Sequence, residues 1–147
     1  EGALRRLIAE LGMEQRIELA GLRPREEIAK RLAQTDCFVL ASESETFGVS
    51  YLEALSCGVP VIATRCGGPE CFVNEHNGIM VETGNVDALA RAMLTIYCNI
   101  DFYNRPAIAQ EVRRVYSSQA VARSLIRQYE NLLDSRETHL EKEAVCR

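Results

Sequence analysis

Two glutamates and the glycine between them are the residues of this chain whose types and spacing best suit ligand chemistry. Glu45 and Glu53 are separated by seven residues, and Gly48 lies between them. A carboxylate accepts hydrogen bonds from hydroxyl groups. A glycine lets an anionic group come close to the main chain because it has no Cβ. The pattern therefore suits a phosphorylated ligand whose neutral hydroxyls are held by carboxylates.

The segments around these residues predict strand, turn, helix and strand. Cys37 to Ala41 is a short apolar run, a helix is expected to open near Phe47 or Gly48 and to end at Gly58, and Val59 to Ala63 is a second apolar run. Ligands collect at the carboxyl ends of parallel strands, where helix amino termini present unpaired N–H groups. The first glutamate falls in such a loop.

One face of the predicted helix is apolar. Val49, Leu52, Leu55 and Ser56 recur at helical spacing, and we expect them to face the sheet. Glu53 lies about 100° around the helix from Leu52, so its side chain is expected to point away from the packing face.

A second glycine-bearing loop, Thr64 to Pro69, follows the next predicted strand. We expect it to emerge at the same edge of the sheet as the Glu45 loop, because both follow parallel strands. Gly67 and Gly68 suit either a plain turn or a close approach to a ligand, and the residues alone leave both interpretations open.

The rest of the chain alternates helices with short apolar strands, which indicates a Rossmann-like, three-layer α/β domain with a parallel sheet. The further elements expected are a helix at Leu4–Leu11, strands at Arg16–Ala20 and Ile79–Val81, and helices at Pro24–Gln34, from Asn85, at Arg105–Val115 and at Ser118–Leu133. We assign residues 1–134 to this domain. Residues 135–147 are expected to form a polar tail or a helical extension.

Composition restricts the classes of partner. Hydrophobic residues make up 47% of the 147 residues, as in an ordinary globular protein. The formal charge of −4 argues against a nucleic-acid or anionic-membrane surface. No apolar run approaches the roughly 18 residues of a membrane helix, so no transmembrane segment is expected. The chain begins at Glu1 without methionine, and we interpret it as a piece of a longer protein or as one whose first residues are missing.

Cysteine spacing and acidic motifs argue against a metal site. The six cysteines contain no Cys-x-x-Cys pair, and several lie in apolar runs, so we expect free thiols in a cytosolic protein. Cys66 and Cys71 lie five positions apart near His76, but zinc sites need tighter spacing and a second pair. No Asp-x-Asp sequence occurs. We expect neither a metal ion nor another cofactor.

Several motifs together resemble a known family. They are the Glu45–Glu53 spacing with Phe47-Gly48 inside it, Gly58-Val59-Pro60-Val61-Ile62-Ala63-Thr64, Gly67-Gly68-Pro69-Glu70 and Asn77-Gly78-Ile79-Met80-Val81. In this order they resemble the C-terminal, donor-binding domain of retaining GT-B glycosyltransferases of the group 1 (family 4) type. The resemblance covers roughly residues 1–133.

The chain departs from the family pattern at its amino-terminal end. The resemblance implies an opening strand, a glycine loop, an Arg and Lys pair that neutralises the donor diphosphate, and another strand, none of which is present. Arg5-Arg6 lies on what looks like a later helix and does not replace the pair. The expected domain therefore lacks its first strands, and the N-terminal acceptor-binding domain is missing as well.

The resemblance implies the roles of individual residues in a hexosyltransferase that uses a nucleotide diphosphate sugar. Glu53 would accept hydrogen bonds from the ribose. Glu45 is the catalytic candidate and would face the hydroxyls of the transferred sugar, with a positioning role favoured over a nucleophilic one. The remaining donor-binding candidates are Thr46, the amides of Phe47, Gly48 and Val49 at the diphosphate, and Gly67 and Gly68 beside the sugar and phosphates.

Two other classes remain open on the sequence: a non-catalytic nucleotide- or phosphate-binding or interaction module, and a GT-B-like sugar-nucleotide epimerase. We expect the isolated chain to be inactive and to form a homo-oligomer through its amino-terminal edge, because unpaired strand edges recruit partners. The full-length enzyme is expected in the cytoplasm, free or at a membrane surface.

Overall fold

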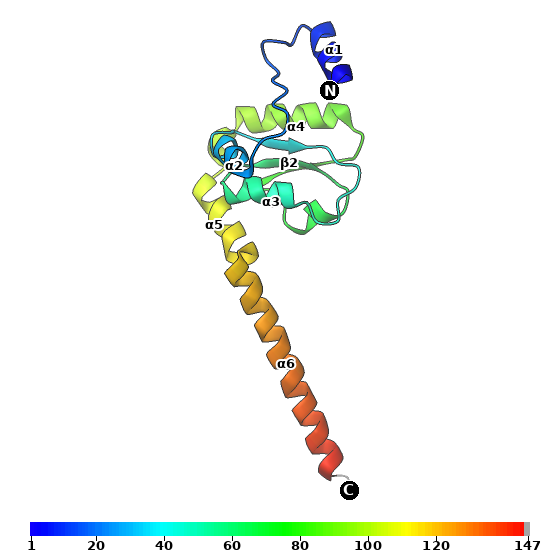
Figure 1. Ribbon diagram of the computed structural model, residues 1–147, viewed down its shortest axis with the longest axis vertical. Coiled ribbons are helices and arrows are strands. Elements are labelled where there is room, and N and C mark those ends of the chain that lie inside the picture. The colour runs from blue at the N-terminus through cyan, green and yellow to red at the C-terminus, as the bar shows by residue number, and fades with distance from the viewer. Residues whose placement is uncertain (146–147) are drawn as a thin grey trace.

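The computed structural model describes the main chain of residues 1–145 and the side-chain surroundings of residues 1–133. Figure 1 shows a small domain from which a long helix extends. The elements are, in chain order, α1 (Gly2–Glu10), α2 (Arg25–Ala33), β1 (Phe38–Leu40), α3 (Val49–Ser56), β2 (Val61–Thr64), η1 (Gly68–Cys71), β3 (Gly78–Val81), α4 (Val86–Cys98), η2 (Ile100–Phe102), α5 (Arg105–Tyr116) and α6 (Ser118–Val145).

The sheet has three parallel strands in the order β1-β2-β3. Its register pairs Val39 with Ile62, and Ile62 with Ile79. Helix α4 lies on one face of the sheet and helix α3 on the other, with α2 beside α3 (Figure 1). The α/β domain with a parallel sheet and helices on both faces, predicted from the sequence, is confirmed.

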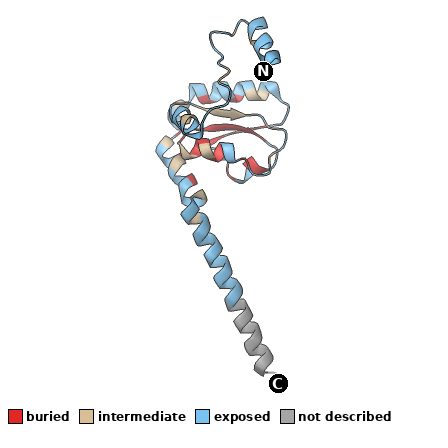
Figure 2. Ribbon diagram, in the orientation of Figure 1, coloured by how far each residue is buried: buried red, intermediate tan, exposed pale blue. Residues whose placement is uncertain are grey.

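The core is centred on β2 and α3. All four residues of β2 are buried, as a parallel strand between two neighbours requires. Tyr51, Leu55, Ile62 and Ile96 are among the largest side chains buried completely. Figure 2 shows this buried material between the helical layers, whereas α1 and the described part of α6 are exposed. The stable part of the molecule is therefore the unit that carries both glycine loops.

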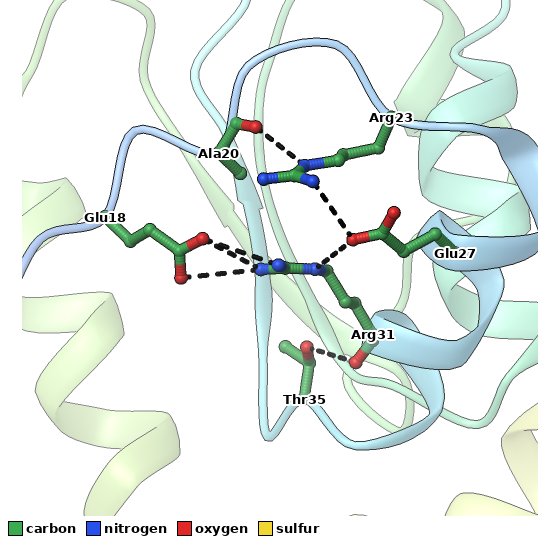
Figure 3. A network of polar contacts seen from close by, with 6 residues as sticks. All are labelled: Glu18, Ala20, Arg23, Glu27, Arg31 and Thr35. Carbon is green, nitrogen blue, oxygen red and sulfur yellow. Dashed lines mark hydrogen bonds and ion pairs between the residues drawn. The ribbon is translucent and has the colours of Figure 1, made fainter.

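The strand predicted at Arg16–Ala20 is absent, and that prediction was wrong. The segment is irregular, and two arginine side chains contact it (Figure 3): Arg31 pairs with Glu18 at 3.4 Å, and Arg23 Nε donates to the Ala20 carbonyl at 2.7 Å. A strand needs a neighbour to accept its backbone hydrogen bonds. Among the described residues no strand pairs with this segment, and the sheet contains only β1, β2 and β3.

The two ends of the chain contribute little to the core. Helix α1 forms where the apolar spacing predicted it, but it buries none of its residues, and Leu4, Leu7 and Leu11 are exposed. Helix α6 begins at Ser118 and continues to Val145, through most of the segment predicted as a polar tail or helical extension. Among the described helices, none has both the length and the apolar character needed to cross a membrane.

Candidate functional site

Main-chain hydrogen bonds join the two glycine loops. The Glu45 N–H donates to the Cys66 carbonyl at 3.2 Å, and the Gly68 N–H donates to the Glu45 carbonyl at 2.8 Å. These bonds form a parallel bridge between Glu45 and Gly67 beyond the carboxyl ends of β1 and β2. The expectation that both loops emerge at one edge of the sheet is confirmed. The bonds fix the two loops relative to each other.

Gly68 permits this close approach, and Gly48 permits the turn that opens α3. Gly48 precedes α3 with φ of +89°, and a Cβ there would lie 2.8 Å from Tyr51 Cδ2. A Cβ on Gly68 would lie 2.4 Å from the Cα of Phe47, which is closer than real Cβ atoms come to other atoms. Side chains are therefore excluded at both positions, and main-chain atoms form this part of the site. The first N–H groups of a helix have no acceptor within it, so the start of α3 suits an anion.

Buried hydroxyl groups fix the base of the Glu45 loop. The Tyr51 hydroxyl donates to the Leu40 carbonyl at 2.6 Å, and the Thr64 hydroxyl donates to the Ser42 carbonyl at 2.5 Å. Burial raises the pKa of Tyr51, and the neighbouring Cys66 and Glu45 add to the increase. The phenol therefore stays protonated at neutral pH and keeps donating. The first bond ties α3 to the end of β1, and the second ties the end of β2 to the start of the loop.

The Glu45 side chain is half-buried and already has a partner. Ser42 Oγ donates to Glu45 Oε1 at 2.9 Å. A carboxylate has about four acceptor sites, so several remain for the hydroxyls of a ligand. Thr46 follows in the exposed turn between Glu45 and Phe47. The loop thus presents one oriented carboxylate beside main-chain donors.

Helix α3 is rotated relative to the sequence prediction. Tyr51, Leu52, Ala54 and Leu55 are buried, whereas Val49, which was predicted to face the sheet, is 59% exposed. The predicted stripe omitted the tyrosine whose hydroxyl reaches β1, and the ring of that tyrosine has to lie against the sheet. The face that contains Val49 is therefore turned outward.

The second glutamate of the pair is accessible and carries an ion pair. The Glu53 side chain is 39% exposed, and its Oε1 lies 2.8 Å from Nη2 of Arg25. Arg25 is the first residue of α2 and its side chain is 83% exposed. The sequence pattern does not indicate this arginine, because the two residues lie 28 positions apart. The only local signal that singles out Arg25 is its position directly after Pro24, at the start of a helix.

Three aromatic rings support the Phe47 end of the site. Phe47, Phe72 and Tyr116 are in mutual edge contact, with ring centroids 5.7 Å (Phe47–Phe72), 5.9 Å (Phe47–Tyr116) and 6.2 Å (Phe72–Tyr116) apart. Such pairs stabilise a fold by about 0.5–1.5 kcal/mol beyond the area that they bury. Phe72 and Tyr116 were not among the site residues predicted from the sequence. The cluster attaches the first glycine loop to the end of α5.

A hollow of about 420 Å³ lies along the outward face of α3. Its lining comes from the Phe47 loop, from α3 and from the α5–α6 junction: Phe47, Val49, Leu52, Glu53, Ser56, Val112, Arg113, Tyr116, Ser117 and Val121. Glu53 is the only acidic group among them. The hollow joins the helix face that carries the accessible glutamate to the aromatic cluster.

A larger hollow, of about 700 Å³, lies at the opposite end of α3 and is lined partly by Arg105 and Arg113. Both arginines bind helix carbonyls. Arg105 donates to the carbonyls of Ala33 and Thr35 at 3.0 and 2.9 Å, and Arg113 donates to that of Ser56 at 3.1 Å. These contacts satisfy the acceptors at the ends of α2 and α3. We therefore assign this hollow a structural role.

Neither the cysteines nor the acidic side chains gather into a metal centre within the described part of the chain. No group of three or more His, Cys, Asp or Glu residues there could hold a metal ion. Cys37, Cys57, Cys66, Cys71 and Cys98 are free, as predicted. Burial raises the pKa of Cys37 to about 11, with a further contribution from Asp36, so this thiol is protonated at neutral pH.

Known proteins are similar to this chain in sequence. The sequence profile described as "Glycosyl transferases group 1" matches residues 1–99. N-acetyl-alpha-D-glucosaminyl L-malate synthase of Bacillus anthracis is 30% identical over 127 residues, which are 86% of this chain and 32% of that protein.

Solved structures are similar to most of the chain. Sucrose-phosphate synthase of Thermosynechococcus elongatus matches with a TM-score of 0.78 at 25% identity, over 90% of this chain and 34% of that one. HepE of Anabaena, in complex with UDP, matches with a TM-score of 0.72 at 27% identity, over 91% of this chain and 36% of that one.

The domain thus has the α/β fold of GT-B glycosyltransferases, and the chain belongs to the group 1 glycosyltransferase family. It spans about a third of the length of the first curated relatives that it matches.

Proposed function

We propose that this chain is the donor-binding part of a retaining, family 4-type glycosyltransferase that moves a hexose from a nucleotide diphosphate sugar to an acceptor. The observation that carries the proposal is the pair of hydrogen-bonded glycine loops at the amino terminus of α3, flanked by an oriented and an accessible carboxylate. The UDP complex of HepE, a structural neighbour, supports the choice of a nucleoside diphosphate.

The diphosphate binds at the start of α3. The N–H groups of Phe47, Gly48 and Val49 face it there, where the helix dipole favours negative charge. Gly67 and Gly68 form the other wall, and their lack of a Cβ lets the main chain of Glu45 and Phe47 pack against them, which holds both loops together beside the sugar and phosphates. Held in this way, the leaving diphosphate is stabilised by fixed N–H donors as its charge develops.

The two carboxylates have different tasks. Glu53 accepts hydrogen bonds from the ribose hydroxyls, for which an accessible, ionised carboxylate is suited. Glu45 contacts the hydroxyls of the transferred sugar, and its bond from Ser42 orients it for that purpose. We assign Glu45 the positioning of the sugar at the reacting centre. The free thiols agree with a reducing compartment such as the cytoplasm.

A nucleotide titration tests the proposal. Amide resonances of the 147-residue chain are followed by NMR during addition of UDP, GDP and ADP. We expect saturable shifts at Gly48, Gly67 and Gly68 with at least one of the three, and smaller shifts with the corresponding nucleoside, which lacks the diphosphate. If no nucleotide shifts these amides, the donor-binding function is wrong.

Nucleotide binding is expected to be independent of divalent metal ions. The diphosphate charge is met by main-chain N–H groups in our proposal, and no acidic cluster accompanies the loops in the described part of the chain. Repeating the titration in EDTA should give the same dissociation constant. Loss of binding in EDTA that Mg²⁺ or Mn²⁺ restores would contradict metal independence.

The chain alone is expected to bind nucleotide weakly and to transfer no sugar. Holding donor and acceptor in reacting geometry contributes about 7–11 kcal/mol, and we propose that the acceptor half belongs to a further domain. The exposed leucines of α1 and the free edge of β1 favour association between copies. Incubation with nucleotide sugars checks the first point, and turnover of any of them would contradict it. Light scattering checks the association between copies, and a strict monomer would contradict that.

A further inference from the structure

The ion pair between Arg25 and Glu53 joins two elements that are distant in the sequence. Arg25 Nη2 lies 2.8 Å from Glu53 Oε1, and the two side chains share this single hydrogen bond. Pro24, with φ of −59°, precedes α2 and places Arg25 in its first turn. The guanidinium therefore reaches α3 from the helix beside it.

The pair is too exposed to matter much for stability. With side chains 83% and 39% exposed, it resembles surface ion pairs, which contribute little to folding because water and salt screen them. Its local effect is geometric, because a bond to one oxygen restricts the torsions of the Glu53 side chain. A function in orienting the carboxylate therefore fits it better than a function in holding α2 against α3.

The contact with Arg25 leaves the Glu53 carboxylate able to accept more hydrogen bonds. A carboxylate has about four acceptor sites on its two oxygens, and Arg25 occupies one of them on Oε1. Two ribose hydroxyls need two more. Arg25 and a ribose can therefore share Glu53, and the arginine fixes the side chain before the ligand arrives.

Neighbouring arginines of the same region have other partners. Arg23 donates to the Ala20 carbonyl and pairs with Glu27 at 3.6 Å, and Arg31 pairs with Glu18 and Glu27 (Figure 3). These contacts stay within the Glu18–Arg31 segment. Arg23 carries the same charge two positions from Arg25, which makes it a matched control.

We propose that Arg25 is a positioning residue that holds the Glu53 carboxylate for the two ribose hydroxyls of a nucleoside diphosphate, and so adds to the preference of the site for ribonucleotides over 2′-deoxyribonucleotides. This inference rests on the proposed function and extends it. Pre-ordering one flexible side chain changes affinity by about twofold to tenfold.

The test compares UDP with 2′-deoxy-UDP by NMR titration of the 147-residue chain and its R25A, R25K, R23A and E53Q variants. R25A is expected to bind UDP about twofold to tenfold more weakly, to lose part of its preference over the deoxynucleotide, and to unfold at the parent temperature. R25K should recover part of the loss, because lysine also reaches the carboxylate but with a less rigid donor. R23A should behave like the parent.

The possible outcomes distinguish the positioning role of Arg25 from the ribose-binding role of Glu53. If E53Q loses affinity and R25A does not, Arg25 has no positioning role although Glu53 does bind ribose. An equal loss in R23A and R25A indicates a general charge effect and also overturns the inference. If the parent binds no nucleotide, or E53Q binds as the parent does, the proposed ribose site is wrong and the role of Arg25 is wrong with it.

Discussion

Replacing Gly68 with alanine is expected to destabilise the domain by about 3 kcal/mol and to abolish nucleotide binding. The added Cβ would lie 2.4–2.5 Å from the Cα, carbonyl carbon and oxygen of Phe47, and main-chain atoms cannot turn aside as a flexible side chain can. The Glu45 and Phe47 loop would have to move. The hydrogen bond from the Gly68 N–H to the Glu45 carbonyl, 2.8 Å long, would be strained or lost.

Urea denaturation and the UDP titration measure the two effects of G68A. The matched control is G84A, in a turn where a Cβ would meet nothing within 4 Å. Its φ of +76° makes alanine unfavourable by about 1 kcal/mol through backbone strain alone. We expect G84A to bind nucleotide as the parent does. A G68A variant with the parent's stability and affinity would show that the contact between the two loops is not required.

Glu53→Gln is expected to weaken nucleoside diphosphate binding by roughly 10- to 150-fold, a loss of about 1.5–3 kcal/mol. The amide keeps the size of the side chain but removes its charge and one of its acceptor oxygens. In the proposed complex, a charged acceptor shared by two ribose hydroxyls would be lost. Stability should change little, because the pair with Arg25 is exposed.

The control for E53Q is Glu43→Gln, which makes the same chemical change at an exposed position in the segment that leads into the Glu45 loop. Dissociation constants from the UDP titration should be unaltered in E43Q. If E53Q binds as tightly as the parent, the ribose role of Glu53 is wrong and the glutamate is an ordinary surface residue of α3. If both variants lose affinity equally, the effect is one of net charge rather than of a hydrogen bond.

The sequence by itself determined the local framework of the site. A short apolar run, a glycine turn, a helix and a second apolar run predict β1, α3 and β2, because these signals act between residues a few positions apart. The same signals located Gly48, Gly67 and Gly68, and parallel topology then placed both loops at one edge of the sheet. A helix was likewise predicted to begin at Asn85, and α4 does begin there, with the Asn85 side chain at its N-cap accepting a hydrogen bond from the Ala88 N–H.

Tertiary structure decided which side chains lie at the candidate site and what holds them. Arg25 reaches Glu53 across 28 positions, and Tyr116 meets Phe47 from the end of α5. Neither contact follows from periodicity. Val49 is exposed because the buried face of α3 is set by the fit of Tyr51 against β1, a property of two elements together.

Strand formation shows the same limit most clearly. The Arg16–Ala20 segment has a strand-like sequence but is irregular, whereas Val61–Thr64 forms a strand between two neighbours. A helix satisfies its backbone within its own sequence, so α1 forms without burying a residue. A strand depends on hydrogen bonds from another segment. The sequence could therefore determine the helices and the glycine loops, while the presence of a partner decided which apolar runs became strands.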